Sequence, residues 1–321
     1  MLMLPLISLP HTALSLSALC LGTGPFGTGL GQTETDRLYA AFREAGGNCF
    51  DTAHCYCFWL PSGNGASERA LGECIRRHGD SGHVRVITKG GHPAQLPDYP
   101  RADYFLSPEV IASDIEDSLE RLGGERIDLY FLHRDDSRVP VGEIMDALAA
   151  HVAVGELGAI GASNWTTGRI EEANAWAAAH GGPGFVASQP EFNLARNNRP
   201  LETGDPAMRY LTSEDIAWHT AHDFPVICYA STANGYFASG GQRAGAAYEN
   251  PTSRARLERV EELARQLDAT PNQIALAWLI QQLFPTIPIL GTSSVEHLQD
   301  ALGAVGGLLV EEQLHWLSGT E

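Results

Sequence analysis

The sequence predicts an α/β fold: a single (β/α)8 TIM barrel that covers residues 1–321 as one domain. Short apolar runs typical of buried parallel strands recur eight times, and amphipathic helical stretches separate them. No low-complexity block or run of charges marks a linker. The expected strands are Ala18–Leu21, Asn48–Asp51, Val84–Thr88, Ile127–Leu132, Ala159–Ala162, Val186–Ser188, Val226–Tyr229 and Ile287–Leu290.

Capping signals mark where several helices begin. Ser107 and Thr270 are each followed by proline, which is a helix N-cap with proline at the first helical position. The expected helices are Thr33–Ala45, Ser67–Arg77, Pro108 to about Arg121, Val141–Val154, Thr167–Ala179, Thr212–His222, Ser253–Leu267 and Pro271 to about Gln282.

Both ends of the chain lie outside the repeating pattern. Residues 1–17 are expected to form an N-terminal hairpin that closes the bottom of the barrel, and Glu311–Leu317 to add to the extra C-terminal helices. A doubly wound sheet is the alternative fold. Its usual sign is a G-x-G-x-x-G motif directly after the first strand, which residues 22–27 only imitate.

The composition excludes several classes of function. The formal net charge is −18, from 39 acidic and 21 basic residues. A field of that sign repels phosphate backbones and anionic lipids, so neither nucleic acid nor a membrane is an expected partner. The N-terminal apolar stretch has no basic residue before Arg37, so no signal peptide is expected. Six cysteines are too few for a disulfide scaffold and fit free thiols in the cytoplasm.

The strand ends carry an unusual set of residues. Barrels place their chemistry at the carboxyl ends of the strands, and three of these ends carry Asp51, His133 and Lys89, the only lysine in the chain. Tyr56 follows Asp51 by five residues. Hydride transfer to a carbonyl leaves charge on oxygen, and a tyrosine hydroxyl can supply the proton if a nearby ammonium lowers its pKa. A carboxylate would hold the ammonium, and an imidazole would orient the substrate oxygen.

With these residues the sequence resembles the aldo-keto reductases over nearly the whole chain. The resemblance implies reduction of aldehydes and ketones with NADPH, less often NADH, by the catalytic residues Asp51, Tyr56, Lys89 and His133. The segments that carry it are LGTGPFG (21–27), FDTAHCY (50–56), GASERALGE (65–73), VITKGG (86–91), IDLYFLHRDD (127–136), GELGAIGASNW (155–165), SQPEFNL (188–194), residues 229–235 and ILGTSSVEHL (289–298).

The resemblance also implies which residues bind the cofactor. Ser163, Asn164 and Gln189 would hydrogen-bond the nicotinamide carboxamide, and Tyr229 would stack on the ring. The other implied cofactor-binding residues are Gly22, Thr23, Gly24, Asp51, Ala230, Ser231, Thr232, Asn234, Gly235, Leu290, Gly291, Thr292, Ser293, His297 and Asp300.

The phosphate end departs from the family pattern. Many relatives place Lys and Arg around the 2′-phosphate, where this chain has Gly291 and His297. NADP is therefore expected to be preferred over NAD by a smaller margin than in those relatives. Arg243 and Arg254, on the long loop after Tyr229, are the remaining candidate cations.

The substrate is expected to be a small carbonyl compound or alcohol, with Phe58, Trp59 and Trp165 as candidate contacts. Two other functions remain open: a lyase that forms a Schiff base on Lys89, and a non-catalytic nucleotide sensor. His54, Cys55 and Cys57 can also be read as metal ligands, but no second ligand pair follows them, so no metal site is expected.

Overall fold

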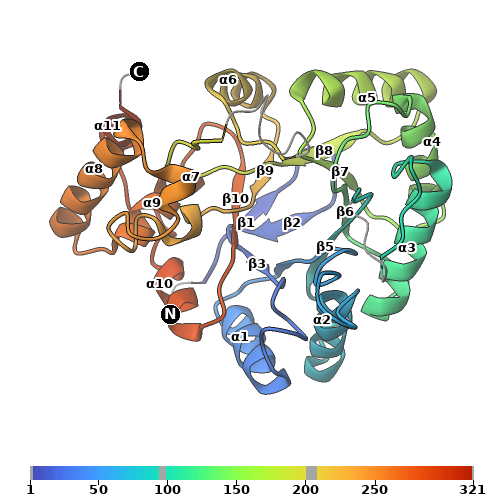
Figure 1. Cartoon of the computed structure of the whole chain (residues 1–321), viewed down its shortest axis with the longest axis horizontal. Coiled ribbons are helices and arrows are strands. Elements are labelled where there is room, and N and C mark those ends of the chain that lie inside the picture. Colours follow the sequence, from blue (N-terminus) through green and yellow to red (C-terminus); the bar gives the residue numbers. More distant parts are fainter. Residues whose placement is uncertain (1–2, 94–98, 200–207, 320–321) are drawn as a thin grey trace.

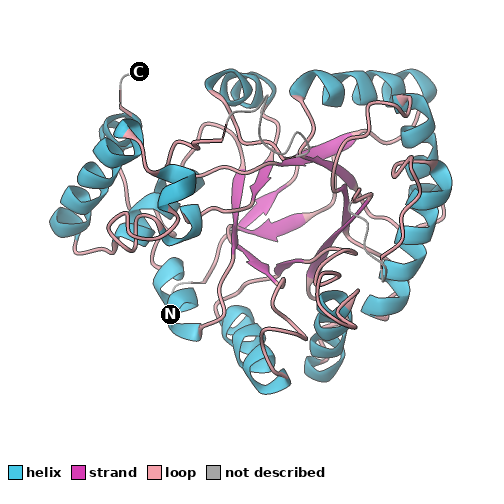
Figure 2. Cartoon of the chain, viewed as in Figure 1, coloured by secondary structure: helices cyan, strands magenta, loops and turns pink. Residues whose placement is uncertain are grey.

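A closed barrel of eight parallel strands forms the centre of the protein (Figures 1 and 2). The computed structural model describes residues 3–93, 99–199 and 208–319. Each strand pairs with the next one along the chain, and β10 closes the ring by pairing with both β9 and β3. The strands are β3 (Cys20–Gly22), β4 (Cys49–Asp51), β5 (Arg85–Gly90), β6 (Leu129–Leu132), β7 (Ile160–Ser163), β8 (Phe185–Gln189), β9 (Val226–Cys228) and β10 (Thr286–Leu290). The predicted (β/α)8 architecture is confirmed.

Helices surround the barrel on its outer side (Figure 2). Within the described part of the chain, none is both long and apolar enough to cross a membrane. The short elements η1 and α7 are additional to the helices expected from the sequence, and both lie in the loop after β9. The helices are α1 (Gln32–Glu44), α2 (Ala66–His78), α3 (Pro108–Leu122), α4 (Val141–Ala153), α5 (Thr167–His180), α6 (Ser213–His222), η1 (Ala233–Gly235), α7 (Gly245–Tyr248), α8 (Pro251–Leu267), α9 (Pro271–Ile280), α10 (Val295–Leu302) and α11 (Glu311–Ser318).

The caps explain why these helices begin where they do. At the start of α9, the Thr270 hydroxyl accepts a hydrogen bond from the Gln273 backbone N–H, and the Gln273 side chain accepts one from the Thr270 N–H. This capping box satisfies two of the backbone donors that a helix start leaves without partners. Thr212 and Asp215 form the same arrangement at α6.

An N-terminal hairpin closes the bottom of the barrel, as predicted. β1 (Leu6–Ser8) and β2 (Ser15–Ser17) pair antiparallel, and Figure 1 shows them across the end of the barrel. Leu9, Leu14 and Leu16 are buried in one cluster with the inward-facing side chains of the barrel strands. The hairpin therefore excludes water from the end of the barrel opposite the predicted site.

Replacement of Leu16 by alanine should measurably destabilise the protein. Leu16 is fully buried, so the change removes apolar contacts and leaves a cavity, which costs about 2–5 kcal/mol. Chemical denaturation would give the change in the free energy of unfolding. Leu6→Ala is the matched control, because Leu6 is 57% exposed on the same hairpin and should change stability by less than about 0.5 kcal/mol. Equal effects of the two variants would contradict this role of the hairpin.

Candidate active site

The Lys89 ammonium lies at the centre of the predicted catalytic group. Its Nζ is 2.7 Å from Asp51 Oδ1, 2.7 Å from the Thr52 carbonyl oxygen and 3.0 Å from the Tyr56 hydroxyl. The strand expected to end at Thr88 continues to Gly90, so Lys89 belongs to β5 itself. Because β4 and β5 are neighbours in the barrel, the carboxylate and the ammonium come from adjacent strand ends. All three protons of the ammonium have acceptors.

Lys89 and Asp51 form a buried ion pair, with each side chain 2% exposed. Burial by itself would lower the pKa of Lys89, but the Asp51 carboxylate and the Tyr56 hydroxyl outweigh it and hold the pKa above its ordinary value. Lys89 therefore stays positively charged at neutral pH.

The pKa of Tyr56 differs from the expectation. The sequence suggested that the ammonium would lower it, whereas burial raises the pKa of Tyr56 to about 12. Lys89 does lower it, but less than burial raises it, and the nearby Asp51 carboxylate raises it further. The ordinary value is about 10. In this structure Tyr56 therefore holds its proton at neutral pH.

His133 follows β6 and lies against the other catalytic residues. The ring centroids of His133 and Tyr56 are 6.1 Å apart, in an edge-to-face arrangement. The His133 Nδ1 is 3.4 Å from the Cys55 Sγ. Burial, followed by the charges of Arg134 and Lys89, lowers the pKa of His133 well below its ordinary value. A neutral imidazole beside Tyr56 can form a hydrogen bond to a substrate oxygen without itself being a strong acid.

His54 fixes the turn that carries Tyr56, a role that the sequence did not reveal. Its backbone N–H donates to the Lys89 carbonyl, at 2.9 Å. Its ring nitrogens lie 3.0 Å from the Tyr99 hydroxyl and 3.0 Å from an Asp117 carboxylate oxygen on α3. These contacts are a hydrogen-bond network that ties the turn to a helix. The sequence signal was ambiguous because a histidine beside cysteines also matches a metal ligand.

The three residues predicted to bind a carboxamide meet at one edge of the barrel mouth. The Ser163 hydroxyl donates to the Gln189 carbonyl oxygen at 2.8 Å, and the Asn164 amide donates to the His133 carbonyl oxygen at 3.2 Å. Gln189 donates to Asp51 Oδ2 at 2.9 Å, while its own side-chain oxygen is buried and accepts no hydrogen bond from the described residues. A buried acceptor of this kind fits a ligand with an N–H group.

Two cavities extend from Tyr229 to the start of α10. One, of about 500 Å³, is lined by Tyr229, and the other, of about 420 Å³, reaches Arg243; Ala230 and Asn234 line both. Because they share lining residues, we describe them together as one elongated cleft. The predicted cofactor residues that line the second cavity are Ala230, Ser231, Thr232, Asn234, Gly235, Leu290, Gly291, Thr292, His297 and Asp300.

The loop at the base of this cleft has an uncommon backbone. Ala230, Ala233 and Asn234 have φ values of 50°, 49° and 51°, and Gly235 has 82°. Left-handed conformations in residues other than glycine cost about 1–3 kcal/mol each and cluster at binding sites. The N–H groups of Ala233 and Gly235 donate to the carbonyl oxygens of Ala230 and Thr232, at 2.8 and 3.0 Å, so the loop holds itself in this turn.

Some predicted cofactor residues have polar atoms that already have partners within the protein. The Asp300 carboxylate accepts from Thr270 and Asn272, each at 2.8 Å. The Thr23 hydroxyl lies 3.0 Å from both the Asp51 carbonyl oxygen and the Ser67 hydroxyl. Gly22 packs against β10, and Gly24 and Gly291 face open space; Ser293 lies outside the lining of the cavity.

The candidate substrate contacts lie in two places. The ring centroid of Phe58 is 5.8 Å from that of His92, which is in turn 4.9 Å from the ring centroid of His133. Phe58 therefore lies next to the barrel mouth. Trp59 packs on Phe58 and is 56% exposed. Trp165 instead packs in the hydrophobic core with Phe185, at 5.2 Å, and is 6% exposed. Its indole N–H is buried without a hydrogen-bond partner among the described residues, so a substrate contact of Trp165 stays a prediction.

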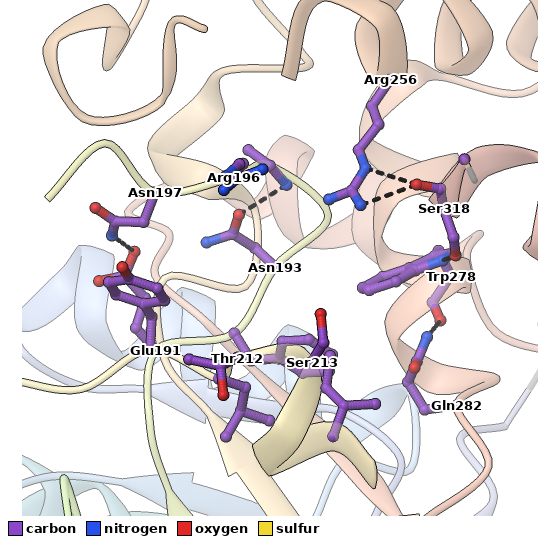
Figure 3. A pocket seen from close by; sticks show the side chains of 16 residues that line it. Glu191, Asn193, Arg196, Asn197, Thr212, Ser213, Arg256, Trp278, Gln282 and Ser318 are labelled. Carbon is purple, nitrogen blue, oxygen red and sulfur yellow. Dashed lines mark hydrogen bonds between the residues drawn. The ribbon is translucent and has the colours of Figure 1, made fainter. Parts of the chain in front are cut away.

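A further cavity, of about 530 Å³, lies away from this chemistry, between the loop after β8 and helices α8 and α9 (Figure 3). None of the four predicted catalytic residues lines it. Asn197 donates to Glu191, and the Trp278 indole N–H donates to the Ser318 hydroxyl (Figure 3). Arg256 donates to the carbonyl oxygens of Leu194 and Ser318. The polar groups that line this cavity thus join the loop after β8 to the C-terminal part of the chain.

The chain is similar in sequence to several known proteins. The uncharacterized oxidoreductase YrpG of Bacillus subtilis (strain 168) is 30% identical over 312 residues, which cover 97% of this chain and 94% of that protein. The aryl-alcohol dehydrogenase of Phanerodontia chrysosporium, whose name specifies NADP(+), is 27% identical over 309 residues, or 92% of this chain and 78% of that protein. The aldo-keto reductase yakc of Schizosaccharomyces pombe (strain 972 / ATCC 24843), also named for NADP(+), is 29% identical over 265 residues, with 77% and 73% covered. A family model described as the aldo/keto reductase family matches residues 18–318. The chain therefore belongs to the aldo/keto reductase family, whose members are oxidoreductases.

Proposed function

We propose that this protein interconverts a carbonyl group and an alcohol, with Tyr56 as the proton donor in reduction and the proton acceptor in oxidation. The observation that carries the proposal is the Lys89 ammonium, buried between the Asp51 carboxylate at 2.7 Å and the Tyr56 hydroxyl at 3.0 Å. This arrangement stabilises negative charge on the Tyr56 oxygen once the proton has left. An aldehyde and ketone panel, followed by the loss of NADPH absorbance, tests it directly.

A nicotinamide cofactor fits the residues that are present. The buried oxygen of Gln189 would accept from the carboxamide, and Tyr229 would cover one face of the ring. The Thr232 hydroxyl and the remaining backbone N–H groups of the 230–235 loop and the Gly291 turn would hold the phosphates. When bound, the nicotinamide supplies or accepts the hydride.

The residues of the chain move and direct the proton. In reduction Tyr56 gives its proton to the substrate oxygen, and Lys89 stabilises the phenolate that results. Asp51 keeps Lys89 charged and in place, since the ammonium would otherwise be a buried charge without a counter-ion. Neutral His133 orients the carbonyl oxygen by a hydrogen bond, in line with its lowered pKa.

The two directions of the reaction should differ in their pH dependence. Tyr56 is protonated below a pKa of about 12, so carbonyl reduction should be nearly independent of pH between about 6 and 9. Alcohol oxidation needs the phenolate, so its kcat/KM should rise about tenfold for each pH unit over the same range. Steady-state rates with a deuterated alcohol would identify hydride transfer as the step observed. An oxidation rate that levels off near pH 7 would contradict the raised pKa.

We also propose NADP(H) as the preferred cofactor. Arg243 lines the cleft, whereas Arg254 donates to Glu249 at 3.0 Å and lies outside its lining. Arg243→Ala should raise the dissociation constant for NADPH about tenfold or more, because a charged hydrogen bond is lost, and should change the value for NADH less. Fluorescence titration measures both constants, and Arg254→Ala is the matched control. Equal losses for the two cofactors would place Arg243 away from the 2′-phosphate.

The lyase alternative has less support. A Schiff base needs a neutral amine, whereas the environment of Lys89 raises its pKa and occupies all three of its protons. Borohydride should therefore trap no substrate on Lys89. The sensor alternative would be favoured by tight cofactor binding without turnover of any carbonyl.

A further inference from the structure

Arg134 is a buried cation for which the described residues provide no counter-ion. Its side chain is 8% exposed, and its Nη1 donates to the His133 carbonyl oxygen at 2.9 Å. None of the ion pairs between described residues, with nitrogen and oxygen within 4.0 Å, includes it. Burial of a charge without an opposite charge is unfavourable by several kcal/mol. Such a group points to a ligand that brings the missing charge.

The acidic residues that follow Arg134 in the sequence pair with other arginines. Asp136 accepts from Arg138 at 2.7 Å, and Asp135 lies 3.4 Å from Arg169. Burial and the Glu191 carboxylate raise the pKa of Tyr229, whereas Arg134 lowers it. The Glu191 carboxylate itself lies 3.4 Å from the Arg199 guanidinium. Sequence proximity therefore does not neutralise the Arg134 guanidinium.

Arg134 also lies at the reacting end of the site. The His133 carbonyl oxygen that accepts from it also accepts from Asn164, at 3.2 Å. Burial has the largest effect on the pKa values of His133, Tyr229 and Cys55, and the charge of Arg134 lowers all three. These residues surround the barrel mouth. Arg134 is absent from the linings of both cavities of the elongated cleft. The printed contact of Arg134 is thus with a residue of the reacting end, and Arg134 does not line the cleft assigned to the cofactor.

The charge at the mouth supports the same conclusion. The opposite charges of Lys89 and Asp51 cancel, and His133 is neutral because its pKa is lowered. Arg134 leaves this region with a positive charge, in a protein whose formal net charge is −18. The negative charge of the whole protein repels anions. The local positive charge of Arg134 attracts an anion that fits at the reacting end.

We infer that the substrate of the proposed reductase is an aldehyde or ketone that carries an anionic group, a carboxylate or a phosphate, which binds Arg134. The planar guanidinium offers several N–H donors to such oxyanions and keeps its charge at every physiological pH. This inference rests on the proposed function, because it assigns the second binding group of the same substrate. Neutral carbonyl compounds would react more slowly, because they leave Arg134 without a counter-ion.

Matched pairs of substrates test the inference. 4-Carboxybenzaldehyde is compared with its methyl ester, and glyceraldehyde 3-phosphate with glyceraldehyde, which separates a carboxylate from a phosphate. In the native protein we expect at least one charged member to have the higher kcat/KM, by about tenfold or more. Arg134→Gln should lower that value about 30-fold or more and change the neutral partner less than about threefold. Arg134→Lys should retain part of the preference.

Two controls separate this role from a general or structural one. Arg126→Gln makes the same change of net charge near the opposite end of β6, where Arg126 is exposed, and should leave both ratios unchanged. Arg134→Gln should not lower the melting temperature, because it removes a buried charge that lacks a counter-ion. A large loss of stability that Arg134→Lys restores, with unchanged substrate ratios, would show a structural role and overturn the inference.

The remaining outcomes distinguish the inference from the proposed function. Equal kcat/KM values for charged and neutral members would overturn the inference and leave the reductase intact. Weaker NADPH binding by Arg134→Gln, with unchanged ratios, would assign Arg134 to the cofactor and also overturn it. If no carbonyl compound is reduced, the proposed function fails, and calorimetry with benzoate and inorganic phosphate tests the anion site alone. Benzoate or phosphate binding that Arg134→Gln abolishes would support the site, and no binding would exclude it.

Discussion

Replacement of Tyr56 by phenylalanine should lower kcat for carbonyl reduction by about 10²–10⁴-fold. The change removes only the hydroxyl group, which lies 3.0 Å from the Lys89 ammonium, and leaves the ring in its partly buried position. Turnover of a reactive aryl aldehyde at saturating NADPH measures the effect. Fluorescence quenching by the cofactor should be retained, because the cleft lined by Tyr229 and Arg243 does not involve this hydroxyl.

Phe58→Leu is a useful comparison for this variant. Phe58 lies two residues further along the same turn and packs on Tyr99 without a polar contact, so its replacement should affect KM more than kcat. Near-normal kcat in Tyr56→Phe would remove Tyr56 from the mechanism. A loss of both turnover and quenching would instead indicate a damaged fold.

Replacement of Lys89 by methionine should cost both stability and activity. It leaves the Asp51 carboxylate buried, at 2% exposure, without its cation. Breaking a buried pair in this way costs about 3–5 kcal/mol, and loss of the charge that stabilises the phenolate should lower kcat/KM by at least about 10²-fold. Chemical denaturation and steady-state kinetics measure the two effects separately.

The double variant Asp51→Asn with Lys89→Met separates these two losses. It removes both charges, so most of the lost stability should return, while activity should not. The introduced asparagine would still offer an oxygen to the Gln189 amide, which now donates to Asp51 Oδ2 at 2.9 Å. Activity that returned together with stability would mean that Lys89 serves the fold alone.

Much of this architecture could be predicted because it depends on local patterns. The buried strands are short apolar runs, and helices such as α9 begin at a capping residue followed by proline. The strand order then follows from the repeat, so the residues at the strand ends come together. Lys89 shows the limit of this precision: β5 extends two residues further than its apolar run, because the lysine side chain is buried by an ion pair and not by apolar contacts.

The features that could not be predicted depend on directions and distances in three dimensions. The Tyr56 pKa depends on the balance of burial against one ammonium, and the sequence shows only the ammonium. The Trp165 ring packs on Phe185 and follows Asn164, whose φ of 62° is a left-handed conformation that the sequence does not reveal. The isolation of Arg134 depends on which arginines reach Asp135 and Asp136, and one of them, Arg169, comes from α5.

The single lysine has a practical consequence for following the folding of this protein. A protease that cuts only after lysine has one site in the chain, at Lys89. In the native state this bond lies within a strand of the closed barrel, with the side chain 2% exposed, and a protease cleft cannot reach it. Cleavage into residues 1–89 and 90–321 therefore needs the barrel to open. The yield of two fragments after a brief exposure to such a protease would report the unfolded fraction without a label or a substrate.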